Sequence, residues 1–158
     1  MPSKTVKETR VTVSHVMQPQ DANVAGNVHG GVIMKLIDTT AGVVATRHAR
    51  SNVVTASIDQ LDFHFPAKIG NLLTFRASIN MVGRTSMEIG VRVDTEDLIT
   101  GRLTHTASAY LTFVALDENG RPREVPRLVP ETEEEKRRLA EARERAARRR
   151  QAREQLRC

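Results

Sequence analysis

The 158-residue chain contains a single cysteine, no tryptophan, one tyrosine and four phenylalanines. A single cysteine excludes an intrachain disulfide. Because Cys158 is the last residue, where a fixed catalytic base is seldom found, we interpret it as an incidental thiol. The scarcity of aromatic side chains removes the platforms on which single-stranded bases usually stack. No apolar stretch is long enough for a membrane span or a secretory signal, so we expect no membrane insertion and a reducing, cytoplasmic compartment.

The excess of basic residues is concentrated near the C-terminus. The chain has 24 Lys and Arg against 19 Asp and Glu, a formal net charge of +5. Residues 1–130 carry 14 basic and 12 acidic side chains, a difference of +2, whereas residues 131–158 carry 10 and 7, a difference of +3. Acids and bases are interleaved in this last segment, which is typical of a solvated helix. We therefore expect no nucleic-acid partner.

Only one segment has the periodicity of a long apolar helix. It extends from Gly30 to about Arg47, and its apolar residues recur at spacings of three and four: Ile33, Leu36, Ile37, Ala41 and Val44. Between Gly30 and Thr46, only Lys35 and Asp38 are charged. A helix with so little charge should be covered on most sides. The preceding residues, 18–27, are rich in turn formers and predict a loop.

Five segments have the composition or the alternation of β-strands: 6–16, 53–63, 72–82, 87–95 and 103–116. The last four of these segments follow the helix, and short connections join the last three, so the four predict an antiparallel meander around the buried helix. The fold class is therefore α+β, with one domain over residues 8–123. A charged helical tail is expected at 131–158, exposed and partly frayed because it contains few apolar residues.

Asp38 is the most informative candidate for chemistry. It lies among small and apolar residues on a nearly uncharged helix, but a surface carboxylate, or one paired with Lys35, would have the same sequence. Gly30 and Gly31 follow His29 at the helix start, where free backbone N–H groups stabilise a carbonyl oxygen that gains negative charge. The same glycine pair is explained by a tight entry into the helix.

The remaining polar candidates each have a plain structural alternative. Asn23 and Asn27 either orient a water or a carbonyl, or simply tolerate turn geometry. Arg84, Thr85 and Ser86 supply a guanidinium and two hydroxyls for a phosphate, or form only a hairpin turn. The histidines lack metal-ligand spacing, and neither the serine-hydrolase elbow nor the P-loop motif is present. No metal site is expected.

Several blocks of sequence together match one known pattern. They are 21–31 (DANVAGNVHGG), 34–38 (MKLID), 53–59 (VVTASID), 83–89 (GRTSMEI) and 125–132 (VPRLVPET). In combination they closely resemble the hotdog-fold acyl-CoA thioesterases of the cytosolic acyl-CoA hydrolase type, over roughly residues 10–138. The resemblance implies the hotdog fold, a long helix wrapped by an antiparallel sheet, which agrees with the periodicity above.

The resemblance also implies an activity, the hydrolysis of fatty acyl-CoA to a free fatty acid and CoA. It places the site between two subunits, with Asn23 of one and Asp38 of the other facing the thioester. Asp38 would be the general base or the nucleophile, and Asn23 would orient the water or the carbonyl. His29, Gly30 and Gly31 would bind the thioester oxygen.

Further expectations follow from the same resemblance. Arg84, Thr85 and Ser86 are candidates for binding the phosphates of CoA, which is part of the substrate and the product. No metal or redox cofactor is implied, and the homodimer would assemble further into a trimer of dimers, a hexamer. Two alternatives stay open: a hotdog dehydratase acting on acyl thioesters, and a non-catalytic sensor of acyl-CoA or nucleotides.

Overall fold

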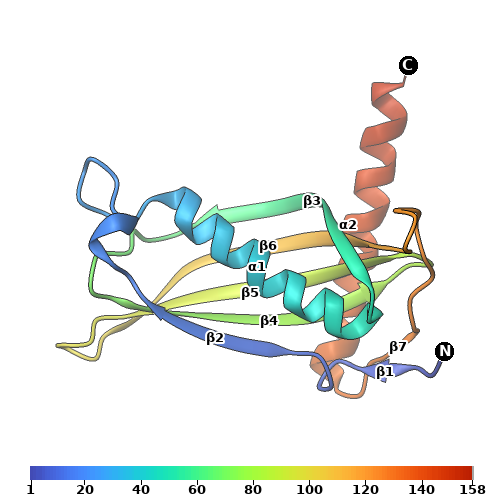
Figure 1. Cartoon of the computed structure of the whole chain (residues 1–158), viewed down its shortest axis with the longest axis horizontal. Coiled ribbons are helices and arrows are strands. Elements are labelled where there is room, and N and C mark those ends of the chain that lie inside the picture. Colours follow the sequence, from blue (N-terminus) through green and yellow to red (C-terminus); the bar gives the residue numbers. More distant parts are fainter. Residues whose placement is uncertain (158) are drawn as a thin grey trace.

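The computed structural model describes residues 1–157 and shows a long helix lying against a curved antiparallel sheet, with a second helix outside the sheet (Figure 1). Cys158 lies outside the described residues, so nothing tests its interpretation as an incidental thiol. The elements are β1 (Lys4–Thr5), β2 (Val11–Val16), a 3-10 helix (Pro19–Asp21), α1 (Gly30–Ala49), β3 (Asn52–Phe63), β4 (Leu72–Val82), β5 (Ser86–Glu96), β6 (Leu103–Leu116), β7 (Leu128–Val129) and α2 (Glu133–Leu156). The predicted α+β hotdog architecture is confirmed. Within residues 1–157, no helix combines the length and the apolar character needed to cross a membrane.

The sheet has the strand order β2-β4-β5-β6-β3, and every neighbouring pair is antiparallel. Of the four strands in the predicted meander, β4, β5 and β6 are neighbours in chain order, but the prediction is wrong for β3. β3, although it precedes β4 in the chain, lies beyond β6, and its other edge has no strand partner among residues 1–157. Alternate residues of the central strands, such as Phe75, Ile89 and Leu111, are buried in the core beneath α1.

The first strand of this sheet is shorter than the sequence predicts. Of the predicted strand 6–16, only the part from Val11 onward pairs with β4. Before it, the N–H groups of Thr9 and Arg10 donate to the Val6 carbonyl at 3.3 and 3.2 Å and close a turn. Alternating polar and β-branched residues do not reveal such local hydrogen bonds.

The helix α1 is fixed at its C-terminal end by a buried histidine. Nε2 of His48 lies 2.7 Å from the carbonyl oxygen of Pro126. Burial lowers the pKa of His48 below its ordinary value of 6.5, which favours the neutral ring with a proton on Nε2. Nζ of Lys4 donates to the carbonyls of Arg47 and His48, at 3.0 and 2.8 Å. These contacts tie the end of α1 to the N-terminal segment and to the segment that precedes α2.

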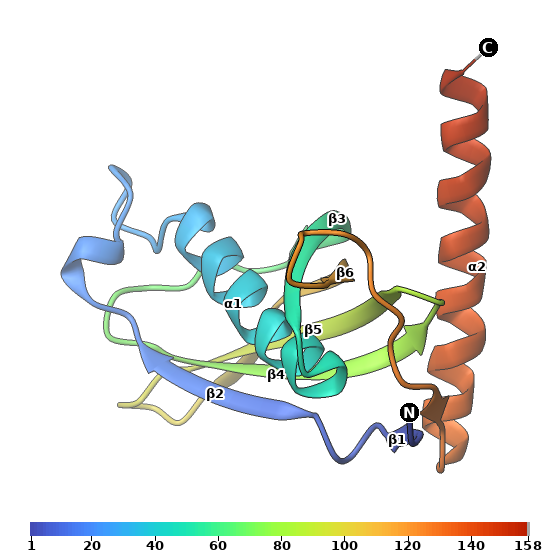
Figure 2. The ribbon, with the colours of Figure 1, turned by 45° about the vertical axis from the view of Figure 1, so that its right-hand side comes forward.

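The prediction of an exposed tail is wrong for the middle turns of α2. Ala142 and Arg145 are buried, because the helix crosses the face of the sheet that points away from α1, called here the outer face (Figure 2). Arg145 donates two hydrogen bonds of 2.9 Å to the Glu88 carboxylate, which is 1% exposed. Burial opposes the charge on Arg145, but the hydrogen bonds and the charge of Glu88 outweigh it and raise the pKa of the guanidinium.

Candidate active site

The carboxylate of Asp38 is held by a residue of the neighbouring edge strand. The hydroxyl of Thr55, on β3, donates a hydrogen bond of 2.6 Å to Asp38 Oδ1. Lys35, the alternative partner considered from the sequence, makes no ion pair with Asp38. Oδ2 of Asp38 has no partner among the described residues. The contact fixes the carboxylate and leaves one oxygen available to a water or a substrate.

Asp38 and Thr55 open onto a cleft of about 440 Å³ beside α1. Its apolar wall contains Val43, Val53 and Phe113. A carboxylate at the edge of an apolar groove is an arrangement that suits proton transfer to or from a ligand lying along that groove. This cleft is the candidate active site.

At the start of α1, the two glycine amides differ in their availability. The Gly31 N–H donates to Nδ1 of His29 at 2.9 Å, so it is not free in this structure. The Gly30 N–H has no partner among the described residues. Because Nδ1 of His29 accepts a hydrogen bond, the neutral ring carries its proton on Nε2. The two donors that the helix start presents are therefore Gly30 N–H and His29 Nε2–H, on an exposed side chain.

Asn23 closes the loop that precedes α1. Its Oδ1 accepts hydrogen bonds from the N–H groups of Ala25 (2.9 Å) and Asn27 (3.2 Å). This role corresponds to the turn-forming alternative considered from the sequence. The side-chain Nδ2, however, has no partner among the described residues, so Asn23 also presents a donor to an incoming carbonyl or water.

A single subunit does not bring all these groups to one point. Asp38 follows Gly30 by eight residues, which is about 12 Å along the axis of an α-helix. Asp38 lines the cleft, whereas Asn23, His29 and Gly30 do not. Within one subunit the candidate groups therefore form two separate sets, a carboxylate in mid-helix and donors at the helix start.

The hairpin between β4 and β5 lies at the same end of the sheet as the cleft. Strand register aligns Thr55 with Phe113, and Phe113 with Met87, which is three residues beyond Arg84. The Arg84 side chain is 78% exposed and lies 3.6 Å from the Glu124 carboxylate. Its guanidinium is thus accessible to a phosphate.

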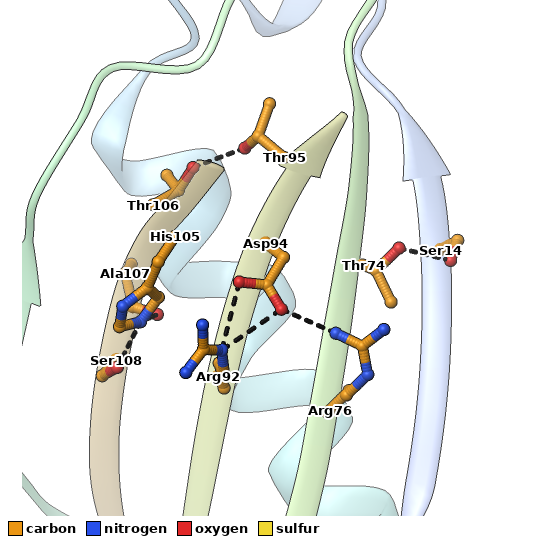
Figure 3. A network of polar contacts seen from close by, with 10 residues as sticks. All are labelled: Ser14, Thr74, Arg76, Arg92, Asp94, Thr95, His105, Thr106, Ala107 and Ser108. Atoms are coloured by element: carbon orange, nitrogen blue, oxygen red, sulfur yellow. Dashed lines mark hydrogen bonds and ion pairs between the residues drawn. The ribbon is translucent and has the colours of Figure 1, made fainter. Parts of the chain in front are cut away.

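The outer face of the sheet carries a larger cleft, of about 610 Å³. It is lined by six arginines: Arg10, Arg76, Arg92, Arg137, Arg138 and Arg145. Five of them are paired with carboxylates, and Figure 3 shows one such group, in which Asp94 lies between Arg76 and Arg92. Among residues 1–157, no group of three or more His, Cys, Asp or Glu side chains could hold a metal ion. The paired charges explain the outer face as structural, and the cleft beside α1 is kept as the candidate active site.

Sequence reasoning missed Thr55, Glu88 and Arg145. Thr55 lies within the matched block 53–59, but only the packing of β3 against α1 shows that it contacts Asp38. Glu88 has the pattern of an outward-facing strand residue, and Arg145 is hidden in a run of arginines. No local signal in the sequence distinguishes them.

Comparison with known proteins adds independent information. The thioesterase superfamily matches residues 25–102. The cytosolic acyl coenzyme A thioester hydrolase of Mus musculus is 42% identical over 139 residues, covering 87% of this chain and 36% of that longer protein. A solved apo-hexameric acyl-CoA thioesterase superimposes with a TM-score of 0.92 at 41% identity, covering 96% of this chain and 97% of that one.

A third similar protein is the acyl-CoA hydrolase of Staphylococcus aureus, solved with butyryl coenzyme A, coenzyme A and coenzyme A disulfide. Its TM-score is 0.90 at 36% identity, with 99% of this chain and 95% of that chain covered. Solved variants of that enzyme replace an Asn, an Asp and a Thr by alanine; the Asp follows the Asn by 15 residues and the Thr follows the Asp by 17. With this similarity over nearly its whole length, the chain belongs to the thioesterase superfamily, as a hotdog-fold acyl-CoA thioester hydrolase.

Proposed function

We propose that this protein hydrolyses fatty acyl-CoA, with Asp38 as the general base. The observation that carries the proposal is the hydrogen bond from Thr55, which holds Asp38 beside an apolar groove with one oxygen unpaired. Asn23, Asp38 and Thr55 also have the order and the spacing, 15 and 17 residues, of the three residues replaced in the S. aureus enzyme. The same three residue types thus recur at matching intervals.

The reaction follows from these groups. Asp38 Oδ2 takes a proton from a water, whose oxygen attacks the thioester carbon and forms a tetrahedral oxyanion. Gly30 N–H and His29 Nε2–H stabilise the oxyanion, while Asn23 Nδ2 orients the carbonyl or the water. The C–S bond then breaks, and the proton returns from Asp38 to the leaving sulfur. Direct attack by Asp38, through an acyl anhydride, uses the same contacts.

We propose that two subunits complete each other's sites. The donors at the helix start and the carboxylate in mid-helix lie too far apart to act together within one chain. A two-fold pairing along the free edge of β3 would place Asn23 of one subunit opposite Asp38 of the other, which gives two equal sites per dimer. A hexameric relative supports further assembly into a trimer of dimers. The cytosolic name of the mouse relative supports a cytoplasmic location.

Release of free thiol from acyl-CoA, followed with a thiol reagent across acyl-chain lengths, tests this function. We expect release from fatty acyl-CoA, and the dependence on chain length reports the depth of the groove formed between subunits. A dehydratase would change the acyl group without releasing thiol. A sensor would bind CoA tightly without turnover. Either result would contradict the proposal.

The exposed guanidinium of Arg84 is proposed to bind a phosphate of CoA. Replacing Arg84 by Ala should raise the KM for acyl-CoA, by about tenfold for the loss of one charge-assisted contact, with little change in kcat. Steady-state kinetics would show this, with Arg102→Ala, on a different loop, as the matched control. An unchanged KM in the Arg84 variant would remove this residue from the phosphate site, for which Thr85 and Ser86 are the other candidates.

A further inference from the structure

We propose that α2 positions Asp38 from the opposite side of the sheet, through the ion pair between Arg149 and Asp59 of β3. This inference rests on the proposed role of Asp38 as the base. Nη1 of Arg149 lies 2.5 Å from Asp59 Oδ2, and both side chains are largely buried, at 19% and 26% exposed. Neither residue lies in the cleft that contains Asp38, so both are positioning residues.

The part of β3 that these residues hold pairs irregularly with the neighbouring strand β6. Its register against β6 shifts twice, between Thr55 and Ser57 and between Asp59 and Asp62. Gln60, between those last two residues, has a left-handed φ of 50°. Only three aligned residues separate the two irregularities, and the ladder is locally disrupted at each of them, so the contact with α2 adds support where regular pairing is short.

The first irregularity also directs two side chains to opposite faces. Thr55 is aligned with Phe113, which is buried in the core, and it faces Asp38 on α1. Past the shift, Asp59 faces outward and meets α2. The same short stretch of strand therefore carries the partner of Asp38 on one face and the partner of Arg149 on the other.

The helix that supplies Arg149 is itself firmly anchored. One turn earlier, Arg145 makes two hydrogen bonds to the buried Glu88, and its guanidinium lies 3.6 Å from the ring centre of Tyr110. Tyr110 is the β6 residue aligned with Asp59. Arg145 and Arg149 thus hold neighbouring points on β6 and β3, and α2 fixes the position of the edge strand relative to the rest of the sheet.

Loss of this support should affect turnover more than binding. If β3 shifts at Thr55, the Asp38 carboxylate loses its fixed orientation, and small misplacements of a catalytic group are costly. The candidate phosphate-binding hairpin belongs to β4 and β5, which remain paired on both sides. A fall in kcat with a nearly constant KM is therefore the expected signature.

The test uses single replacements in the full-length chain. Arg149→Ala and Asp59→Asn should each lower kcat about five- to tenfold, with KM changed by less than about twofold. Arg149→Lys keeps the charge and should restore most of the activity. Arg150→Ala, at the exposed neighbouring arginine, is the matched control and should behave like the unmodified protein. Normal kcat in the folded Arg149→Ala protein, confirmed by circular dichroism, would overturn the proposal.

A double-mutant cycle with Thr55→Val tests the route of the effect. Thr55→Val removes the hydroxyl that binds Asp38, so adding Arg149→Ala should cause little further loss of kcat. A full additional loss in that background would show that Arg149 acts elsewhere, and the proposal would fail while the role of Asp38 stands. Normal turnover in both Thr55→Val and Asp38→Ala would instead refute the catalytic assignment, and the positioning role with it.

Discussion

Replacing Asp38 by Ala is expected to lower the turnover of acyl-CoA by at least about a hundredfold, the lower end for loss of a general base. The reason is structural. Thr55 fixes one carboxylate oxygen and leaves the other available in the cleft, and no other carboxylate lines that cleft. The rate of thiol release at saturating acyl-CoA measures the effect, and size-exclusion chromatography reports whether the oligomer is intact.

Two further variants make the result specific. Asp38→Asn keeps the size of the side chain and an oxygen for Thr55, but it cannot accept a proton from water, so it should be nearly as inactive as Asp38→Ala. Lys35→Ala removes a nearby charge of the same helix, on an exposed side chain, and should leave turnover close to normal. Turnover near the original rate in a folded Asp38→Ala oligomer would contradict the assignment of the base.

The sequence was informative where one period governs a whole segment. The three- and four-residue spacing from Ile33 to Val44 predicts α1, because residues at these intervals lie on one face of an α-helix and that apolar face packs on the core. Alternation predicts β4, β5 and β6 in the same way, and their short connections predict that they are neighbours. The expected position of Asp38 on a covered helix follows from that periodicity and from the scarcity of other charges.

What the sequence could not show depends on contacts between distant segments. Thr55 lies 17 residues from Asp38, and only the position of β3 beyond β6 brings its hydroxyl to the carboxylate. Likewise, the tail has too few apolar residues for its sequence to predict that α2 docks on the sheet. The contact is made instead by the guanidinium of Arg145 and the carboxylate of Glu88. The hydrogen bond from the Gly31 N–H to Nδ1 of His29 depends on the rotamer of the histidine side chain, which the periodicity of the sequence does not predict.

The largest effect on stability is expected for Arg145→Ala, which should lower the free energy of unfolding by about 3–5 kcal/mol. Removing the guanidinium leaves the Glu88 carboxylate buried, with hydrogen-bonding support only from Asn80 at 3.1 Å. Arg149, at 3.8 Å from Glu88, is too distant to replace two hydrogen bonds of 2.9 Å. Urea denaturation at one fixed protein concentration measures the change, because subunit association also contributes to stability.

Two comparisons separate the buried charge from the loss of helix packing. Arg137→Ala breaks only exposed ion pairs with Glu134 and Glu141 on the same helix, so it should change stability little. The double variant Glu88→Leu, Arg145→Met removes both charges while keeping apolar volume, and should recover most of the loss. If the double variant is as unstable as Arg145→Ala, the loss of stability arises from packing under α2 and not from the buried Glu88 carboxylate left without its ion pair. If Arg145→Ala is as stable as the original protein, α2 is not docked on the sheet in solution, and the support that it gives to β3 is absent as well.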